Sequence, residues 1–403
     1  MKNIRNDFPI FSNNEKLIYF DNAATTQKPK FVIDAISDFY SFYNAPAFRG
    51  VYALSENVTQ KFEDVREKVA KFIGADKTEI AFTYGSTDGI NIIAQSWAKN
   101  NLQSGDTIIV SQLEHHSNLV AWQRLAEQKN LNLKFIKVTA DGILDLEQFY
   151  SILDSKVKFA SVTYVSNVLG AHVDIKYISN ALKTIGAKLL VDASQAPAHM
   201  KLDVKELGAD FLVFSSHKMF GPDGVGVLYV NSNLHDQISP SRGGGGMVFD
   251  VNIEKTNFLK FPRILEAGSQ PVSGVMGLGA AIDYINNNIN YDQLKIHEAS
   301  LCRTLIDNLI NVSGVKILGP IEQLKTSGHM VSFSFDKIHP HDIAAYLDKF
   351  GICVRAGHHC AQPLHNILKI NGSVRVSFAA YNTLKEVYLL IELINKISKG
   401  LFI

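Results

Sequence analysis

The sequence predicts an α/β fold, with a mostly parallel, doubly wound sheet in a large domain and a smaller α+β domain at the carboxyl end. Between about residues 29 and 230, helical patterns alternate with short strand-like runs, which indicates repeated βαβ units. After residue 285 the pattern changes to helix, strand, helix, two strands and a last helix. Ligands of doubly wound sheets bind beyond the carboxyl ends of the strands, so functional side chains are expected there.

Each expected strand of the large domain is short and rich in β-branched or aromatic residues, and each expected helix repeats apolar residues at helical spacing. The first four expected strands are EIAFT (79–83), DTIIV (106–110), VKFASVTYV (157–165) and AKLLVDAS (187–194). The expected helices include FEDVREKVAKFIG (62–74), INIIAQSWAKN (90–100) and YISNALKTIG (177–186). Two further strands are expected in DFLVFSSHKMFGPDGVGVLYV (210–230), on either side of a glycine-rich turn.

Segment 239–274 interrupts this alternation with two turn-rich stretches, SPSRGGGGMV and EAGSQPVSG. We expect a functional loop there rather than disorder, because apolar residues continue on both sides. The later expected strands are HMVSFSF, ICVRA and SVRVSFA, and the last helix is KEVYLLIELINKI. The domains are expected at 21–285 and 286–403, with 1–20 packing against the smaller one.

The composition excludes several classes of protein. Lys plus Arg number 40 against 39 for Asp plus Glu, a formal net charge of +1, which argues against nucleic acid or an anionic membrane as partner. The first residues, MKNIRNDFPIF, contain no signal-peptide apolar stretch, and no later run is long enough for a membrane span. Three cysteines are too few for a disulfide framework, so we expect reduced thiols and a cytoplasmic location.

Two charged residues lie at the ends of expected strands. Lys218 stands between two apolar runs, and Asp192 ends the strand AKLLVDAS. A surface lysine and a strand-end turn cap are the ordinary interpretations of such residues. Pyridoxal phosphate needs both types, a lysine for its aldehyde and a carboxylate beside its ring nitrogen. The pair therefore indicates a site for that cofactor.

A phosphate site is expected where a strand leads through Gly85 into a helix that begins with Ser86 and Thr87. Free amides at a helix N-terminus favour a dianion, although an ordinary N-cap gives the same pattern. Ser215 and His217, just before Lys218, can donate to the same phosphate. In LEHHSNLVAWQ, His115 is expected to stack on a flat ring, since no further metal ligands lie at suitable spacing.

The stretch GICVRAGHHCAQPL indicates a reactive thiol. Cys360 follows His358 and His359 on a polar loop, where cationic neighbours favour a thiolate. Cys302 and Cys353 are instead interpreted as small buried hydrophobes. Arg375, in an otherwise apolar strand, is expected to bind a substrate carboxylate, with Arg355 supporting the loop.

Six motifs occur in one order along nearly the whole chain: YFDNAATTQKP, GSTDGIN, LEHHSNLVAWQ, VDASQAPAH, SSHKMFGPDGVGVLY and VRAGHHCAQPL. Their sequence resembles class V aminotransferase-fold enzymes, and in particular the sulfur-mobilisation (SUF-type, group II) branch of cysteine desulfurases. The resemblance implies a fold type I homodimer with an aspartate aminotransferase-like large domain and pyridoxal 5′-phosphate as cofactor. It also implies L-cysteine as substrate, L-alanine as product, and a persulfide on Cys360 that a SUF acceptor protein collects for iron–sulfur cluster assembly.

The resemblance also implies roles for single residues. Lys218 would bind the cofactor covalently, Asp192 would contact its ring nitrogen and His115 would lie over the ring. Cofactor contacts are further implied for Gln195 and Asn167 near the ring hydroxyl and substrate, for Ser86, Thr87, Ser215 and His217 at the phosphate, and for Ser269 from the neighbouring subunit.

Other functions remain open. A selenocysteine lyase, a kynureninase-like hydrolase or an epimerase would keep Lys218 and Asp192, but none of them needs Cys360. A binding or scaffold protein on a decayed enzyme fold would carry no cofactor. In KIHPHDIAAYLDKFG, His341 lies either in a turn capped by Asp342 or, by resemblance, where a histidine can bind the zinc of a sulfur acceptor.

Several residues depart from the family pattern. Phe48 and Tyr52 replace common histidines, and Tyr84 replaces a basic residue. Gly246 stands where a glutamate is frequent, and Ser269, Gln270 and Pro271 replace Thr-Pro-Asn. These positions are expected on loops at the entrance and at the dimer boundary.

Overall fold

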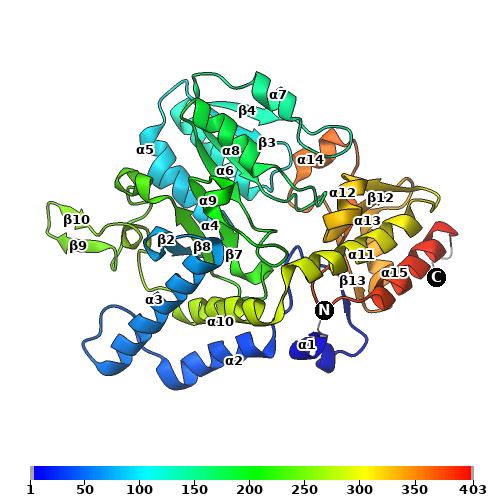
Figure 1. The fold of residues 1–403 in the computed structure, drawn as a ribbon, viewed down its shortest axis with the longest axis horizontal. Helices are drawn as coiled ribbons and strands as arrows, with labels where there is room; N and C mark the ends of the chain where they lie inside the picture. Colours follow the sequence, from blue (N-terminus) through cyan, green and yellow to red (C-terminus); the bar gives the residue numbers. More distant parts are fainter. Residues whose placement is uncertain (1–3, 401–403) are drawn as a thin grey trace.

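The computed structural model describes residues 4–400, and its largest element is a seven-stranded sheet with the order β2-β8-β7-β6-β5-β3-β4 (Figure 1). In this order the strands are β2 (Ile80–Thr83), β8 (Gly226–Val230), β7 (Phe211–Ser215), β6 (Lys188–Asp192), β5 (Val157–Thr163), β3 (Thr107–Ser111) and β4 (Asn132–Ile136). The pairs from β7 to β4 are parallel, and β8 is antiparallel to both of its neighbours. The sheet is therefore mostly parallel, as predicted.

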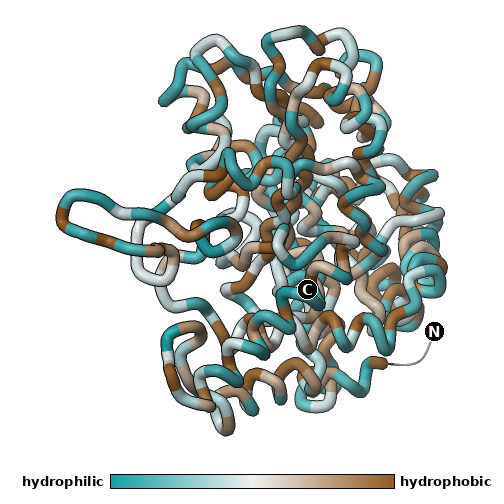
Figure 2. The backbone as a smooth tube through the Cα atoms, turned by 60° about the vertical axis from the view of Figure 1, so that its left-hand side comes forward, coloured by the Kyte–Doolittle hydropathy of each residue, from teal (hydrophilic) through white to brown (hydrophobic). Residues whose placement is uncertain are grey.

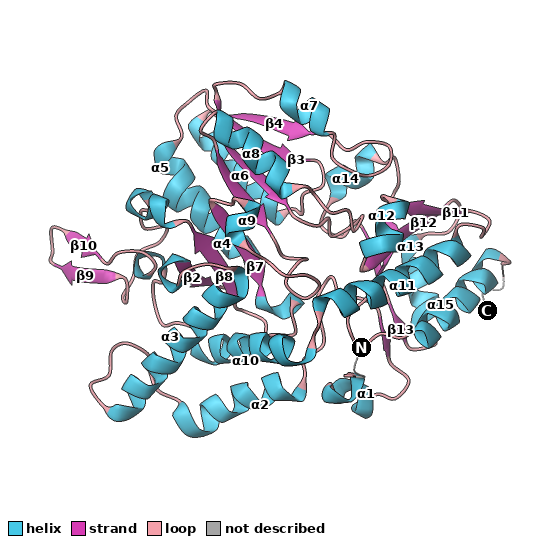
Figure 3. Cartoon of the chain, in the orientation of Figure 1, coloured by secondary structure: helices cyan, strands magenta, loops and turns pink. Residues whose placement is uncertain are grey.

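Helices cover both faces of this sheet (Figure 3). In strand β2, Ile80 and Phe82 belong to one buried apolar cluster, whereas Ala81 belongs to another. Side chains alternate along a strand, so the two clusters lie on opposite faces. The first cluster includes residues of α3 (Ala53–Ile73), α8 (Ile175–Thr184) and α10 (Val272–Asn288); the second includes α4 (Ser86–Ile93) and α6 (Ser117–Lys129).

A second, antiparallel sheet has the order β11-β12-β15-β14. Its strands are β11 (Val315–Leu318), β12 (Met330–Phe335), β15 (Ser373–Ser377) and β14 (Arg355–Gly357). The helices α11 (Tyr291–Leu309), α13 (Pro340–Asp348) and α15 (Leu384–Ser398) share an apolar core with this sheet. Near the N-terminus, β1 (Ile18–Tyr19) pairs in parallel with β13 (Ile352–Cys353), so the early chain joins the late one.

The remaining α-helices are short, and α2 is the longest of them. They are α1 (Pro9–Asn13), α2 (Lys30–Asp38), α5 (Lys99–Asn101), α7 (Leu146–Ser151), α9 (Val204–Leu207), α12 (Ile321–Ser327) and α14 (Gln362–Ile367). Figure 2 shows short hydrophobic stretches interspersed with hydrophilic ones along the backbone. Across residues 4–400, no helix combines the length and the apolar character that a membrane span needs.

Three local expectations differ from the structure. Segment 239–274 was expected to be loop, but it contains an antiparallel hairpin of β9 (Val248–Val251) and β10 (Thr256–Phe258) that projects from the body (Figure 1). The run ICVRA forms two strands in different sheets, because β13 pairs with β1 while β14 pairs with β15. The predicted helix 90–100 continues α4 only through a π-helical turn at 94–98 before α5.

Candidate active site

A cavity of about 200 Å³ lies at the carboxyl ends of the parallel strands. Strands β7, β6, β5 and β3 all end at this edge, so the residues that follow them converge although they are far apart in sequence. The structure brings together twelve of the predicted site residues in the cavity wall. They are Ser86, Thr87, His115, Asn167, Asp192, Gln195, Ser215, His217, Lys218, Arg355, Cys360 and Arg375.

Lys218 follows β7 through one turn of 3-10 helix, Ser216–Lys218. The preceding carbonyl oxygen, of His217, accepts hydrogen bonds from the Thr25 and Thr26 hydroxyls and from the Lys28 amine, which fix the turn. Burial lowers the pKa of Lys218 to about 8, although the Asp192 carboxylate opposes the shift. A larger share of the amine is therefore neutral near neutral pH, and only a neutral amine can attack an aldehyde.

Asp192 ends β6 and is buried. Its Oδ1 accepts from the backbone N–H of Ser194 at 3.0 Å and from the Ser194 hydroxyl, so the carboxylate does stabilise a turn. Its Oδ2 accepts no hydrogen bond from the described residues. One oxygen thus fixes the carboxylate in place, while the other is available to a cationic ring nitrogen.

Hydroxyl groups gather at the N-terminus of α4. The Ser86 N–H donates to Ser215 Oγ at 2.8 Å, and the Ser86 hydroxyl contacts the hydroxyls of Ser215 at 2.8 Å and Ser194 at 2.6 Å. Gly226 on β8 has no side chain here, where a Cβ would come within 2.5 Å of the Gly85 backbone. The helix end and these hydroxyls form a cradle of the kind that binds a phosphate dianion.

His115 is held as a neutral ring. Its Nδ1 accepts from the Ser117 N–H at 3.1 Å, so the single ring proton is on Nε2. Burial, followed by the charge of Lys218, lowers the pKa of His115 to about 3. Burial also lowers the pKa of His217 to about 4. A flat, uncharged imidazole in this position suits stacking on an aromatic cofactor.

The loop that carries Cys360 leaves the small sheet after β14 and contacts segments that follow β3 and β5 of the large sheet. His359 and Cys360 both have left-handed backbone angles, with φ of 52° and 56°. The His116 N–H donates to the Cys360 carbonyl at 2.7 Å, and the Asn167 amide donates to the His359 carbonyl at 2.7 Å. The other two cysteines lie outside the cavity: Cys302 is buried in α11 and Cys353 lies in β13.

Arg375 on β15 lies directly opposite Arg355 on β14. Its two terminal nitrogens already donate, one to the Asn167 carbonyl at 2.8 Å and one to Asp21 at 2.9 Å. Its Nε is buried and has no hydrogen-bond partner in the described structure. Arg375 can therefore donate to a substrate carboxylate only through Nε or through the N–H groups of the terminal nitrogens that these two contacts do not use.

Two predicted residues are outside the cavity. Ser269 is exposed and lines a separate cavity of about 310 Å³ with Phe48 and Gly246. His341 lies in the first turn of α13, and its N–H donates to Nδ1 of His339, which is the N-cap. The expectation that Asp342 caps this helix is therefore wrong, because the imidazole of His339 takes that role.

The departures from the family pattern also lie away from the cavity. Phe48 adopts φ of 72°, and the guanidinium of Arg263 lies 3.5 Å from the centre of its ring. Gly246 has φ of 89°, and its carbonyl accepts from Arg263 at 3.1 Å. Tyr52 is the N-cap of α3, and Tyr84 lies beneath Arg242. Phe48 and Gly246 thus line the second cavity, whereas Tyr52 and Tyr84 lie just before α3 and α4.

Sequence reasoning missed several residues of the site. Ser194 holds Asp192, Asp21 pairs with Arg375, and Ser117 contacts both His115 and Thr87. Ser194 could have been found, because a serine two residues after a strand-end aspartate is typical of a local turn. Asp21 could not, since its partner lies 354 positions away in the chain.

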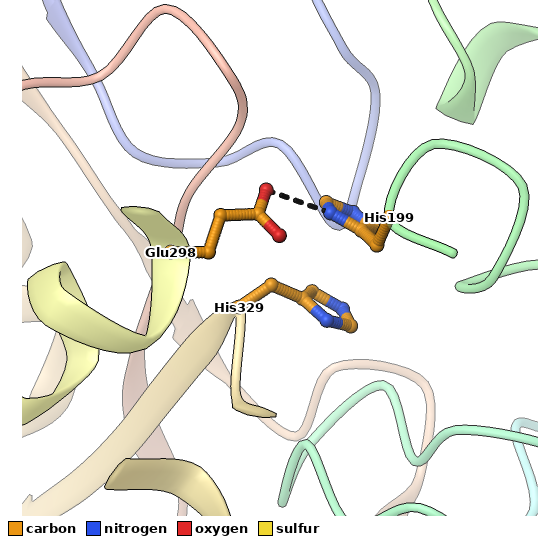
Figure 4. Close-up of side chains that lie close together, drawn as sticks. All are labelled: His199, Glu298 and His329. Atoms are coloured by element: carbon orange, nitrogen blue, oxygen red, sulfur yellow. Dashed lines mark hydrogen bonds and ion pairs between the residues drawn. The ribbon is translucent and has the colours of Figure 1, made fainter. Parts of the chain in front are cut away.

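A second buried group of ionisable side chains, His199, Glu298 and His329, lies outside the cavity (Figure 4). Nδ1 of His199 contacts Oε1 of Glu298 at 2.8 Å, and the rings of His199 and His329 stack at 3.7 Å with an angle of 8°. Three possible ligand atoms lie within 4.8 Å of one another. However, ring lone pairs lie in the ring plane, so two parallel rings do not direct them to one metal. The group is a stacked, hydrogen-bonded joint.

Comparison with known proteins places this architecture in a family. The family model described as Aminotransferase class-V matches residues 18–390. A cysteine desulfurase of Serratia proteamaculans (strain 568) is 40% identical over 404 residues, which cover 99% of this chain and 98% of the relative. The solved apo structure of a cysteine desulfurase from Thermococcus onnurineus NA1 has a TM-score of 0.94 at 39% identity and covers 98% of each chain. The Escherichia coli cysteine desulfurase CsdA, solved with an S-sulfonic acid, gives 0.91 at 34% identity, with 99% of this chain and 98% of the other covered.

Proposed function

The chain belongs to the class V aminotransferase family and is a pyridoxal-phosphate-dependent cysteine desulfurase, and from this premise we propose that Cys360 takes the sulfur of L-cysteine as a persulfide for iron–sulfur cluster assembly. The observation that carries the proposal is that Lys218, Asp192 and Cys360 line one cavity. A kynureninase-like hydrolase or an epimerase would need the first two but would have no use for the thiol.

The residues of the cavity fit pyridoxal 5′-phosphate. The cradle at the N-terminus of α4 suits its phosphate, and Oδ2 of Asp192 suits its ring nitrogen. The neutral ring of His115 suits stacking, and the amine of Lys218 suits the aldehyde. When bound, the cofactor supplies an electron sink for the charge that forms at the substrate Cα.

The side chains of the cavity have separate roles in the proposed reaction. Arg375 and Arg355 bind the carboxylate of L-cysteine, and the Lys218 amine moves the proton at Cα. The Cys360 thiolate attacks the substrate sulfur, so the C–S bond breaks as an S–S bond forms. In sum, L-cysteine and the Cys360 thiol give L-alanine and a Cys360 persulfide. An acceptor thiol then removes the outer sulfur by exchange.

The nucleophile is tested by Cys360→Ala in the holoenzyme. We expect the variant to keep its visible cofactor band but to release L-alanine from L-cysteine at least about 10²-fold more slowly, because no other thiol lines the cavity. Cys353→Ala is the matched control, since Cys353 lies in β13 outside the cavity, and it should keep the wild-type rate. Full turnover by Cys360→Ala with a thiol reductant would refute the role of Cys360.

We also propose a SUF-type homodimer in which Ser269 reaches the phosphate of the partner subunit. Support comes from the exposure of Ser269, which lines the second cavity. Tyr40 lines the same cavity, and Tyr40 and the nearby Phe42 are exposed aromatic residues of the kind that a partner subunit can cover. A cytoplasmic location is supported by three cysteines without disulfides.

The acceptor is proposed to be a SUF protein that approaches the start of the Cys360 loop. A Cβ on Gly357 would lie 3.4 Å from Nε2 of His341, so this histidine is next to that loop. This proximity supports a role for His341 as a ligand to a zinc ion that an acceptor brings.

A further inference from the structure

A line of three hydroxyl groups joins the cradle at the N-terminus of α4 to Asp192. Ser194 donates to Oδ1 of Asp192 through both its backbone N–H and its hydroxyl. The Ser194 hydroxyl lies 2.6 Å from that of Ser86, which lies 2.8 Å from that of Ser215. All four side chains line the cavity, and each residue is at most 9% exposed. The line therefore connects the end of the cavity that suits the phosphate with the end that suits the ring nitrogen.

The protons of this line all point in one direction. Oδ1 of Asp192 accepts the Ser194 N–H, so this oxygen carries no proton and the Ser194 hydroxyl is the donor to it. A hydroxyl has one proton, so the Ser194 oxygen can only accept from the Ser86 hydroxyl. Ser86 has then used its own proton, and Ser215 donates to the Ser86 oxygen. The protons thus run from Ser215 towards Asp192, and none of them is free for a phosphate.

A bound phosphate would compete with Asp192 for these protons. A dianion at a helix N-terminus accepts hydrogen bonds strongly, and the hydroxyls of Ser86 and Ser215 lie at that helix end. When the Ser86 hydroxyl turns to the phosphate, the Ser194 oxygen loses its donor. Hydrogen bonds in a chain strengthen one another, so the bond from Ser194 to Asp192 then becomes weaker. The two ends of the cavity are therefore coupled through the Ser194 hydroxyl.

This hydroxyl is the one part of the line that belongs to neither end. Without it, Asp192 keeps the hydrogen bond from the backbone N–H of residue 194, at 3.0 Å, so the turn does not depend on the hydroxyl. The helix end likewise keeps the bond from the Ser86 N–H to Ser215 Oγ, at 2.8 Å. Removal of the Ser194 hydroxyl thus disconnects the two ends and leaves both the carboxylate and the cradle in place.

We propose that Ser194 is a positioning residue that couples the two ends of the cofactor site, because its hydroxyl holds the Asp192 carboxylate for the ring nitrogen and draws the Ser86 proton away from the phosphate. The inference rests on the cofactor position proposed above. Loss of the hydroxyl should have opposite effects at the two ends. Ser86 becomes free to donate to the phosphate, whereas the carboxylate keeps one donor instead of two. A general loss of structure would weaken both ends.

Two probes separate the two ends in the full-length chain after removal of the cofactor. Inorganic phosphate tests the cradle alone. The analogue 4′-deoxypyridoxine 5′-phosphate tests the cradle and the ring-nitrogen contact together, and it has no aldehyde, so its binding does not depend on a bond to Lys218. Isothermal titration calorimetry gives the Kd of each probe for wild type, for Ser194→Ala and for Ser194→Thr, which keeps the hydroxyl and is the matched control.

We expect Ser194→Ala to bind inorganic phosphate about 2- to 5-fold more tightly than wild type, because the Ser86 hydroxyl no longer has to leave another acceptor. The ratio of the Kd of inorganic phosphate to that of the analogue should fall about 3- to 10-fold, because the carboxylate is held by fewer hydrogen bonds. Ser194→Thr should keep both wild-type values. Weaker binding of both probes by the same factor in Ser194→Ala, or unchanged binding, would overturn the proposal. A wild-type chain that binds inorganic phosphate but not the analogue would instead refute the cofactor position on which the proposal rests.

Discussion

Asp192 shows how one side chain can satisfy two demands. Ser194 donates twice to Oδ1, which anchors the carboxylate, and Oδ2 stays available to the cofactor nitrogen. The ordinary interpretation of a strand-end aspartate as a turn cap is therefore confirmed. The same turn leaves Oδ2 available for the contact that we propose with the cofactor.

Asp192→Asn tests the charge without removing the turn, because an amide oxygen can still accept from Ser194. We expect the rate of L-alanine release to fall between about 10-fold and 100-fold, since a hydrogen bond to a charged group is replaced by a neutral one. The variant should still contain the cofactor, which its absorbance would report. Asp210→Asn is the control, because Asp210 lies before β7, at the opposite end of the sheet. A wild-type rate for Asp192→Asn would contradict the assigned contact.

Sequence pattern could predict Lys218, Asp192 and His115 because each follows an apolar strand, and parallel strands end at one edge. It could not predict the role of Asp21, because the bond of Asp21 to Arg375 joins parts of the chain that no local pattern relates.

The loop between β14 and α14 is the element that carries Cys360, the nucleophile that we propose. It contains two consecutive residues with left-handed backbone angles that are not glycine, which costs conformational energy that its surroundings must offset. His116 contributes twice, through its N–H to the Cys360 carbonyl and through Nε2, which accepts from the Gln362 N–H at 3.1 Å.

His116→Ala removes the second of these contacts. We expect alkylation of Cys360 by iodoacetamide to become about 2- to 10-fold faster and L-alanine release to become slower by a similar factor, because one hydrogen bond no longer holds the loop. His116→Gln offers an amide oxygen near the position of Nε2 and should restore both rates. Unchanged alkylation in His116→Ala would show that the loop does not depend on this bond.

Most elements were predictable, but the β9–β10 hairpin was not. Phe249, Asp250 and Val251 are all exposed, so the strand has no alternation between a buried and a solvent face. The division of ICVRA between β13 and β14 was also hidden, because an apolar run does not reveal which partner strand each half will choose.

At the scale of the whole molecule, several histidines are buried in the neutral form. The pKa of His115 is lowered to about 3 and that of His172 to about 4, and the pKa of His329 is lowered well below its usual value, in each case mainly by burial. When the chain unfolds, these rings regain an ordinary pKa near 6.5 and bind protons. The stability they contribute is present above about pH 6.5 and is lost as the pH falls towards the folded values.

Glu298, beside His199, acts in the opposite sense. Burial raises its pKa, so its contribution is present at low pH and is lost as the pH rises through the raised value. Burial likewise raises the pKa of Glu114, to about 8, but the buried neutral histidines outnumber these two carboxyl groups and decide the direction of the acid dependence.

The temperature at the midpoint of thermal unfolding should therefore decrease when the pH is lowered from 7 to 5. Each fully titrating histidine should lower the free energy of unfolding by up to about 1.4 kcal/mol per pH unit. His329→Asn removes one such ring from the joint in Figure 4, and we expect a smaller fall in the midpoint over the same range. Differential scanning calorimetry at the two pH values measures this. Equal falls in wild type and variant would contradict the assignment of His329 as a neutral buried ring.

The amine of Lys218 is attached to the large sheet, and the thiol of Cys360 is attached to the small one. During translation the ribosome releases the first of these well before the second. The late residues Ala361, Leu364 and Tyr381 belong to the same apolar core as residues of the large sheet. The two groups that we propose to react therefore meet only once the end of the chain has packed against its earlier part.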